Sequence, residues 1–224
     1  MERRTLIASV GTVAGCSALS GCLGVLDGDS NPNVVLGDPG RPFDSEDAAY
    51  PAWGEPLPEV TLPAPLESRE LELGSITRPR LMTFFYSNCR TVCPVLISSL
   101  RNIQTHATDN GYADEVAFLP VTFDPERDTA DRLRTYADER NLDTDAENWH
   151  FLRPESTERA KAVVEEEFGV AFQRTHPEDM DEYMFTHTSL TLLVNADGYV
   201  ERAYRDQSPD VNAILADLER VRQA

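Results

Sequence analysis

Two cysteines separated by three residues could do chemistry in this sequence. Cys89 and Cys93 lie in the stretch YSNCRTVCPVL, where Pro94 and an apolar run follow directly. Thiolates are soft ligands that select Cu(I), and a neighbouring pair of thiols can also oxidise to a disulfide. The pair therefore fits three interpretations: a metal site, a redox switch or a structural cross-link.

The first residues predict that the chain is exported. Arg3 and Arg4 precede a weakly hydrophobic stretch of small residues that ends in Leu-Ser-Gly-Cys at Cys22. That stretch is shorter than the ~20 apolar residues that span a membrane, and the paired arginines are typical of a Tat signal. We expect residues 1–21 to be a Tat-type lipoprotein signal peptide, with lipid on Cys22 at the outer face of the cell membrane. Cys16 is a second, weaker cleavage candidate.

Removal of this signal leaves Cys89 and Cys93 as the two cysteines of the folded chain. Disulfides persist outside the cytoplasm, but a secreted structural framework usually has more bridges in a smaller domain. One bridge across so short a loop would also constrain the unfolded chain little. The pair is therefore better interpreted as a metal or redox site than as a structural cross-link.

The charge composition is strongly acidic. Asp and Glu number 39 against 20 for Lys and Arg, which gives a net charge of −19, and Lys161 is the single lysine. Carboxylates spread along a whole chain indicate a heavily solvated surface whose self-repulsion salt must screen, as in proteins of halophiles. Nucleic acid is excluded as a partner, because the sequence has no basic patch that would release counterions.

The sequence after the signal divides into two parts. Residues 22–57 are rich in Gly, Pro, Asp and Ser and show no periodicity, which predicts a flexible acidic tether. Residues 58–224 are long enough for one domain with a sizeable core. We expect the tether to hold that domain away from the membrane.

Within the domain, strand and helix patterns alternate. Apolar β-prone runs predict strands, and 3.6-residue periodicity predicts helices, with Asp128 and Ser208 as helix caps. The expected strands are 80–86, 115–124, 148–154, 187–194 and 199–205, and the expected helices are 94–107, 127–141, 156–169 and 208–223. This order predicts an α/β fold with a central mixed β-sheet flanked by helices.

The position of the cysteines also predicts the kind of fold. A cysteine pair between a central strand and the next helix resembles the thioredoxin-like fold, and open α/β sheets place their sites at such junctions. The spacing differs from the redox Cys-x-x-Cys motif. Three intervening residues widen the loop, so that both sulfurs can face one small ion and still form a disulfide.

Four segments together resemble the Sco/SenC family of thioredoxin-like copper chaperones. They are FFYSNCRTVCP, VTFDPERDT, NWHFL and the segment EYMFTHTSLTLLVNADG, in that order. The resemblance implies a membrane-anchored protein that helps to assemble the dinuclear copper centre of a haem-copper oxidase. It also implies that Cys89, Cys93 and His187 bind copper, as Cu(I) and, through the added imidazole, also as Cu(II).

Two positions depart from the family pattern. Arg90 stands where proline is common, and its charge would favour the thiolate form of its neighbours. Thr186 stands where an aspartate commonly precedes the histidine, which removes a carboxylate that could orient His187.

Asp124 is a candidate outer group of the site, with a turn aspartate before Pro125 as the alternative interpretation. We expect His187 itself in a loop just before a strand.

Two principal functions stay open on the sequence alone. A copper chaperone that delivers metal to an oxidase subunit requires His187. A thiol-disulfide oxidoreductase that keeps the cysteines of the oxidase copper site reduced requires only Cys89 and Cys93, with a thiol reductant as partner. Peroxide reduction on the same scaffold is a third alternative and needs one attacking thiolate.

Overall fold

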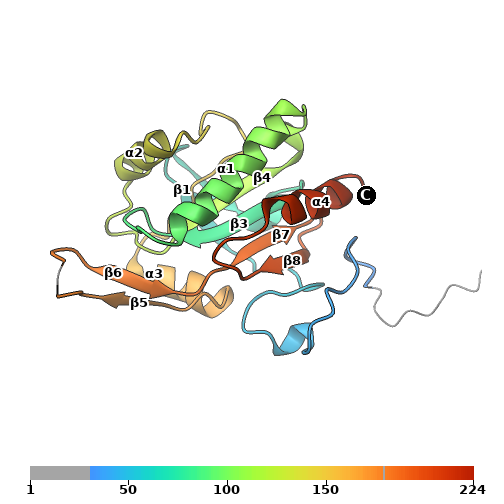
Figure 1. Ribbon diagram of the computed structural model, residues 1–224, viewed down its shortest axis with the longest axis horizontal. Coiled ribbons are helices and arrows are strands. Elements are labelled where there is room, and N and C mark those ends of the chain that lie inside the picture. The colour runs from blue at the N-terminus through green and yellow to red at the C-terminus, as the bar shows by residue number, and fades with distance from the viewer. Residues whose placement is uncertain (1–30, 179) are drawn as a thin grey trace, which may run out of the picture.

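The computed structural model describes residues 31–178 and 180–224 (Figure 1). Its centre is a four-stranded sheet in the order β4-β3-β7-β8. Strand β3 runs parallel to β4 and antiparallel to β7, and β7 runs antiparallel to β8. The bounds are Arg80–Phe85 for β3, Ala117–Thr122 for β4, Thr191–Val194 for β7 and Val200–Tyr204 for β8. The predicted mixed sheet is therefore confirmed.

The two parallel strands are the most deeply buried part of the sheet. Every residue of β3 and β4 is buried, as expected for unbroken apolar runs covered on both faces. The expected third strand, 148–154, lies along the outer edge of β4 but pairs with it through two isolated bridges, at Trp149 and Leu152. Pro120 explains the interruption, because it lies between these bridges and has no N–H to donate.

Helices α1 (Cys93–Asp109) and α4 (Val211–Arg222) lie over the same face of the central sheet (Figure 1). Their apolar residues recur at helical spacing and are buried. These residues are Leu96, Ile97, Leu100 and Ile103 on α1, and Ile214, Leu218 and Val221 on α4. Val95, directly before this buried set in α1, is exposed. Within the residues described, no helix combines the length and the apolar character needed to cross a membrane.

Both predicted helix caps are wrong by one or two residues. Helix α2 (Ala130–Arg140) is capped by Thr129, whose side chain accepts a hydrogen bond from the Arg132 N–H, whereas Asp128 is buried. Helix α4 is capped by Asp210, which accepts from the N–H groups of Asn212 and Ala213, in place of Ser208. In both cases several polar residues precede the helix, and the backbone path decides which one reaches the free N–H groups.

The expected helix 156–169 forms in two pieces. Ser156 caps α3 (Thr157–Ala160), and the chain continues as a π-helical segment, Lys161–Glu167. Gly169 ends it with φ +65°, and a Cβ there would lie 1.6 Å from the carbonyl oxygen of Ala49. Only glycine fits, because the N-terminal segment packs against this turn.

The described part of the expected tether packs against the domain. Besides the short 3-10 helix Ser45–Asp47 and an isolated bridge between Pro56 and Tyr199, residues 31–57 have irregular backbone, yet Leu36 is buried. The N–H groups of Val35 and Leu36 donate to the buried carboxylate of Glu201 on β8, and Trp53 Nε1 donates to the Leu36 carbonyl. Most of these contacts use backbone groups, which every residue has. The packing therefore leaves no periodic pattern of side chains in the sequence. Residues 22–30 and the signal segment lie outside the described residues.

Two short hairpins were not expected. Strands β1 (Thr61–Ala64) and β2 (Arg69–Glu72) form one, and β5 (Phe172–Thr175) and β6 (Met184–His187) form the other. Figure 1 shows the β5-β6 hairpin extending beyond the central sheet. Single-turn 3-10 helices Leu73–Ser75 and Ala113–Glu115 complete the described elements. Four-residue strands with few apolar side chains give too weak a pattern for recognition.

Candidate metal centre

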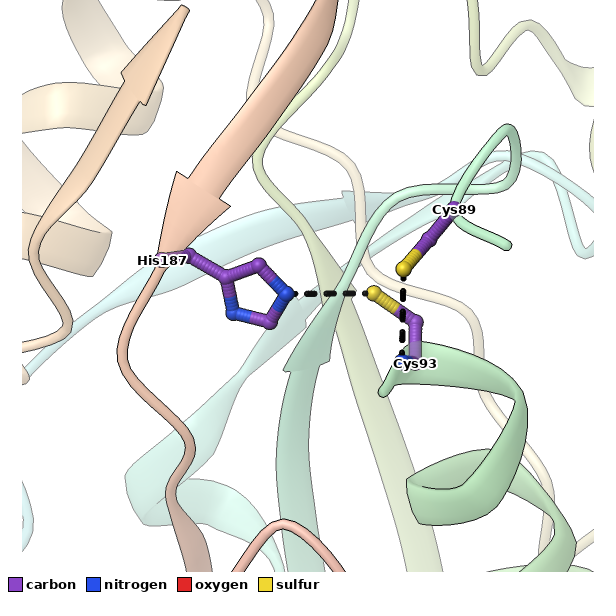
Figure 2. A group of neighbouring side chains, drawn as sticks. All are labelled: Cys89, Cys93 and His187. Carbon is purple, nitrogen blue, oxygen red and sulfur yellow. Dashed lines mark hydrogen bonds between the residues drawn. The ribbon is translucent and has the colours of Figure 1, made fainter. Parts of the chain in front are cut away.

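One cysteine lies within a short loop and the other directly after it. Residues 86–92, the cysteine loop, join β3 to α1, and Figure 2 shows Cys89 on this loop and Cys93 at the start of the helix. The Cys89 N–H donates to the Tyr86 carbonyl, which closes a turn. Pro94 follows in the first turn of α1, where its missing N–H costs nothing. Local sequence therefore brings both sulfurs to the end of a central strand.

Cys89 is the more acidic thiol. Its Sγ accepts the Cys93 backbone N–H at 3.4 Å, at the positive end of α1. The pKa of Cys89 falls from 9.0 to about 3, chiefly because the Cys93 side chain hydrogen-bonds to it, with His187 and nearby backbone N–H groups adding to the effect. Arg90 is exposed and is not among these principal causes. The loop geometry, more than the neighbouring arginine, favours the thiolate.

Cys93 has the opposite tendency. It is fully buried, and burial raises its pKa well above the ordinary value of a thiol, with the neighbouring Cys89 sulfur adding to the rise. Without metal, these opposite shifts favour the thiolate at Cys89 and the thiol at Cys93. Both cysteines are free in this structure.

His187 comes from a distant part of the chain. It is the last residue of β6, not a loop residue as expected, and its Nε2 lies 3.4 Å from the Sγ of Cys93 (Figure 2). Its Nδ1 lies 3.0 Å from the Thr188 carbonyl oxygen, which can only accept a hydrogen bond. Nδ1 therefore carries a proton, and in the neutral ring the lone pair of Nε2 faces the cysteines. The Thr188 carbonyl thus orients the ring although Thr186 replaces the family's aspartate.

Aromatic side chains form one wall of the site. The rings of Tyr86 and Phe123 lie 6.2 Å and 5.1 Å from the His187 ring, measured between centroids. Phe185 packs edge-on against both of these aromatic rings. The sequence did not predict this wall, although Tyr86 and Phe185 come from the same motifs as the cysteines and the histidine, and Phe123 comes from the segment VTFDPERDT. Its effect is to keep the histidine in place and to limit water on that side.

The three side chains fit a single small metal ion. The ligand atoms of Cys89, Cys93 and His187 all lie within 4.8 Å of one another, and no other such group occurs among the described residues. With bonds of ~2.3 Å to sulfur and ~2.0 Å to nitrogen, as for zinc, trigonal coordination places these atoms ~3.7–4.0 Å apart. Two thiolates and an imidazole suit Cu(I), whereas a structural zinc site has four ligands.

Asp124 belongs to a neighbouring polar network. It is buried and accepts hydrogen bonds from Arg127 and, at 2.9 Å, from the Tyr183 hydroxyl. The Arg127 guanidinium stacks on the Tyr183 ring at 3.6 Å and donates to the Tyr183 carbonyl. Because Tyr183 immediately precedes β6, this network connects the loop after β4 to the strand that carries His187. Asp124 is linked to the site through that strand.

The remaining histidines have local partners. His106 Nδ1 lies 2.6 Å from the Tyr112 hydroxyl. Buried His150 has Nδ1 2.7 Å from a Glu67 oxygen. The ring of His176 lies 6.1 Å from that of Tyr183, measured between centroids. His187 is the histidine that reaches the cysteines.

Sequence comparison places this arrangement in a known family. The SCO1/SenC profile matches residues 74–223, which is more than half of the chain. The chain belongs to the SCO1/SenC family. Among curated members, the SCO2-like protein RC0895 of Rickettsia conorii is 30% identical over 135 residues, which are 58% of this chain and 60% of the relative. The match thus spans less than two thirds of that relative's length.

Solved structures of Sco proteins share the fold. The crystal structure of Arabidopsis thaliana ScoI with copper bound has a TM-score of 0.61 and 20% identity, over 79% of this chain and 100% of that chain. BsSco, described as having a disulfide switch and as a member of the Sco family of cytochrome c oxidase assembly proteins, has a TM-score of 0.59 and 20% identity, over 80% of this chain and 98% of that chain. The predicted thioredoxin-like fold is confirmed.

Proposed function

We propose that this protein is a membrane-anchored copper-binding chaperone that delivers copper to the dinuclear copper site of a haem-copper oxidase. The observation that carries the proposal is the convergence of Cys89, Cys93 and His187, with ligand atoms within 4.8 Å of one another. Two sulfurs and one imidazole nitrogen form a donor set that selects copper.

Each of the three residues has a distinct part in holding the cargo ion. Cys89 offers a thiolate, and Cys93 must lose its proton when the ion arrives, so that binding releases one proton. His187 offers the Nε2 lone pair that the Thr188 carbonyl directs toward the cysteines. Three ligands are enough for Cu(I), and the imidazole also suits Cu(II).

A groove beside the histidine could admit a partner. A cavity of about 600 Å³ is lined by His187, by its neighbours Thr186 and Thr188, and by residues of β5 and the π-helical segment. A client chain in this groove could approach the copper ligand without unfolding the site. The proposed client is the copper-site subunit of the oxidase.

The family members support this assignment. The Arabidopsis relative has been solved with copper bound, and BsSco is described as a member of a family of cytochrome c oxidase assembly proteins. Because these structures are 20% identical to the chain, they support the proposal by analogy of fold and family. The three copper ligands are carried over at matching motif positions.

The cysteine pair also favours a second function, thiol-disulfide exchange. An acidic Cys89 beside a buried Cys93 thiol is the arrangement of an attacking and a resolving cysteine. Such a protein would keep the cysteines of the oxidase copper site reduced and would itself need a thiol reductant. The two functions are compatible, because reduced cysteines bind copper and a disulfide does not.

The proposed location rests on the sequence. Arg3, Arg4 and the Leu-Ser-Gly-Cys box at Cys22 support Tat export and a lipid anchor on the outer face of the cell membrane. The packed segment that begins near Asn33 would leave only about ten residues between the lipid and the domain. The anchored domain would therefore stay close to the membrane.

Anaerobic titration of the reduced domain with Cu(I) in high salt tests the copper assignment. We expect one Cu(I) per chain, and His187→Ala should weaken binding ~10-fold to 100-fold, the usual scale for the loss of a metal-site partner. His176→Ala, a change of an exposed histidine on the same hairpin, is the matched control. Equal affinity in the wild type and the His187 variant would overturn the three-ligand site.

A further inference from the structure

A buried carboxylate lies next to the cysteine loop without belonging to the three-residue cluster. Asp128 follows β4, and its side chain is fully buried. It accepts the Ser87 backbone N–H at 3.0 Å and the hydroxyl protons of Ser87 and Thr122. Ser87 is the second residue before Cys89, so these bonds act at the entry to the cysteine loop.

The directions of these hydrogen bonds follow from their other partners. The Thr122 hydroxyl oxygen accepts the Asp124 N–H at 3.1 Å, and the Ser87 hydroxyl oxygen accepts Arg132 Nε at 3.0 Å. Each hydroxyl keeps its own proton for Asp128. Asp128 therefore acts as an acceptor in all of these bonds, which is the role of a carboxylate.

Ser87 is held at every polar group. Asp128 accepts from its N–H and hydroxyl, while Arg132 donates to its hydroxyl oxygen and, at 3.3 Å, to its carbonyl oxygen. Both partners come from the segment that forms the start of α2. Cys93, in contrast, is positioned by α1. The separation of the two sulfurs therefore depends on two different supports.

We propose that Asp128 is a positioning residue of the cysteine site. Through Ser87 it fixes where Cys89 lies relative to Cys93 and His187, and so it determines copper affinity and the ease of disulfide formation. The copper part rests on the proposed function. The disulfide part requires only the two sulfurs, so the two parts can fail separately.

Asp128→Asn is the principal test. Asparagine keeps the size of the side chain but replaces one acceptor oxygen with an NH2 group, which would face groups that are themselves donors. Cu(I) affinity should fall by at least ~10-fold, the lower end of the range for partners outside the first ligand shell. Asp138→Asn on the exposed face of α2 changes the net charge equally and should bind Cu(I) like the wild type.

A metal-free measurement accompanies the titration. Equilibration with a mixture of reduced and oxidised glutathione gives the ratio of disulfide to dithiol at Cys89 and Cys93, because oxidised glutathione accepts the two electrons and becomes two reduced molecules when the disulfide forms. A loosened loop lowers the effective concentration of one thiol at the other, so Asp128→Asn should shift this ratio toward the dithiol by at least ~3-fold. Leu218→Ala is the control for lost stability, because Leu218 is buried on α4, which is neither part of the cysteine loop nor bonded to Ser87. This change should leave both the Cu(I) affinity and the disulfide-to-dithiol ratio of the folded protein unchanged.

The combined results decide the proposal. If wild-type protein does not bind Cu(I), the proposed function is wrong, and the disulfide ratio alone tests Asp128. If Asp128→Asn does not fold even in molar salt, Ser87→Ala takes its place. This change removes one hydrogen bond to a charged group, so the Cu(I) affinity or the disulfide-to-dithiol ratio should fall by at least ~3-fold. Folded Asp128→Asn with wild-type copper affinity and a wild-type disulfide ratio would overturn the positioning role.

Discussion

His187 Nε2 lies 3.4 Å from the Sγ of Cys93, although 94 residues separate the two in the chain. The β5-β6 hairpin carries the histidine, and the β3-α1 junction carries the cysteine. The site therefore exists only when the hairpin is docked against the cysteine loop. One observed contact of this docking is the hydrogen bond from Asn88 to Glu182, at 2.6 Å.

Oxidase assembly in cells should distinguish the two proposed functions. Under the chaperone proposal, the oxidase lacks its copper centre in cells that carry any of three variants: His187→Ala, Cys89→Ser or Cys93→Ser. Each variant removes one of the three copper ligands. Added copper should partly rescue the histidine variant, which keeps both soft ligands. Normal assembly with His187→Ala and failure with both cysteine variants would favour thiol chemistry, because thiol exchange needs only the sulfurs.

The two thiols should react with an alkylating agent at different pH. The pKa of Cys89 in the folded protein is lowered from 9.0 to about 3. Its thiolate form therefore contributes stability to the fold, fully above pH 9, and this contribution is lost as the pH falls toward 3. Because the alkylating agent reacts with the thiolate form, the folded, metal-free protein should be labelled at Cys89 before Cys93 near pH 6. Mass spectrometry can show the order of labelling. Equal labelling that rises only near pH 9 at both sites would contradict this.

Lipid anchoring at Cys22 can be checked by fractionation. We expect the mature chain to start at Cys22 and to remain with the membranes. Cys22→Ser should block processing or release the protein, whereas Cys16→Ser should do neither. An intact mass that corresponds to an unlipidated chain with residues before Cys22 would exclude the anchor.

Salt should stabilise the folded domain strongly. At a net charge of −19, repulsion between carboxylates opposes the compact state until counterions screen it. The melting temperature should therefore rise steeply between low and molar potassium chloride. A melting temperature that stays constant over this range would show that the acidic surface imposes no such penalty.

Glu201 should anchor the N-terminal segment. Its buried carboxylate accepts from Val35, Leu36 and the Asn195 side chain, so Glu201→Ala removes the acceptor for three donors. We expect a loss of ~1–3 kcal/mol in the free energy of unfolding and earlier protease cleavage within residues 33–57. The exposed Glu219→Ala on α4 is the control. Unchanged cleavage in the Glu201 variant would show that other contacts hold the segment.

Local patterns in the sequence were enough to predict the parts of the molecule that are contiguous in the chain. Cys89 and Cys93, the strand before them and the helix after them are contiguous, so spacing and apolar periodicity were enough to predict a cysteine pair at a strand-helix junction. The order of the four motifs indicated the Sco/SenC family, and the resemblance to that family indicated His187 as the third ligand. These inferences needed no knowledge of distances through space.

How the distant parts of the chain meet became known from the three-dimensional fold. His187, at the end of β6, reaches Cys93 across 94 residues, and Asp128 supports Ser87, 41 residues earlier, instead of capping α2. The Thr188 carbonyl that orients the His187 ring is a choice among neighbouring polar groups. The same holds for the docking of residues 33–57 on Glu201. Such contacts satisfy buried polar groups one at a time, and because they follow no repeat, they leave no periodic signal in the sequence.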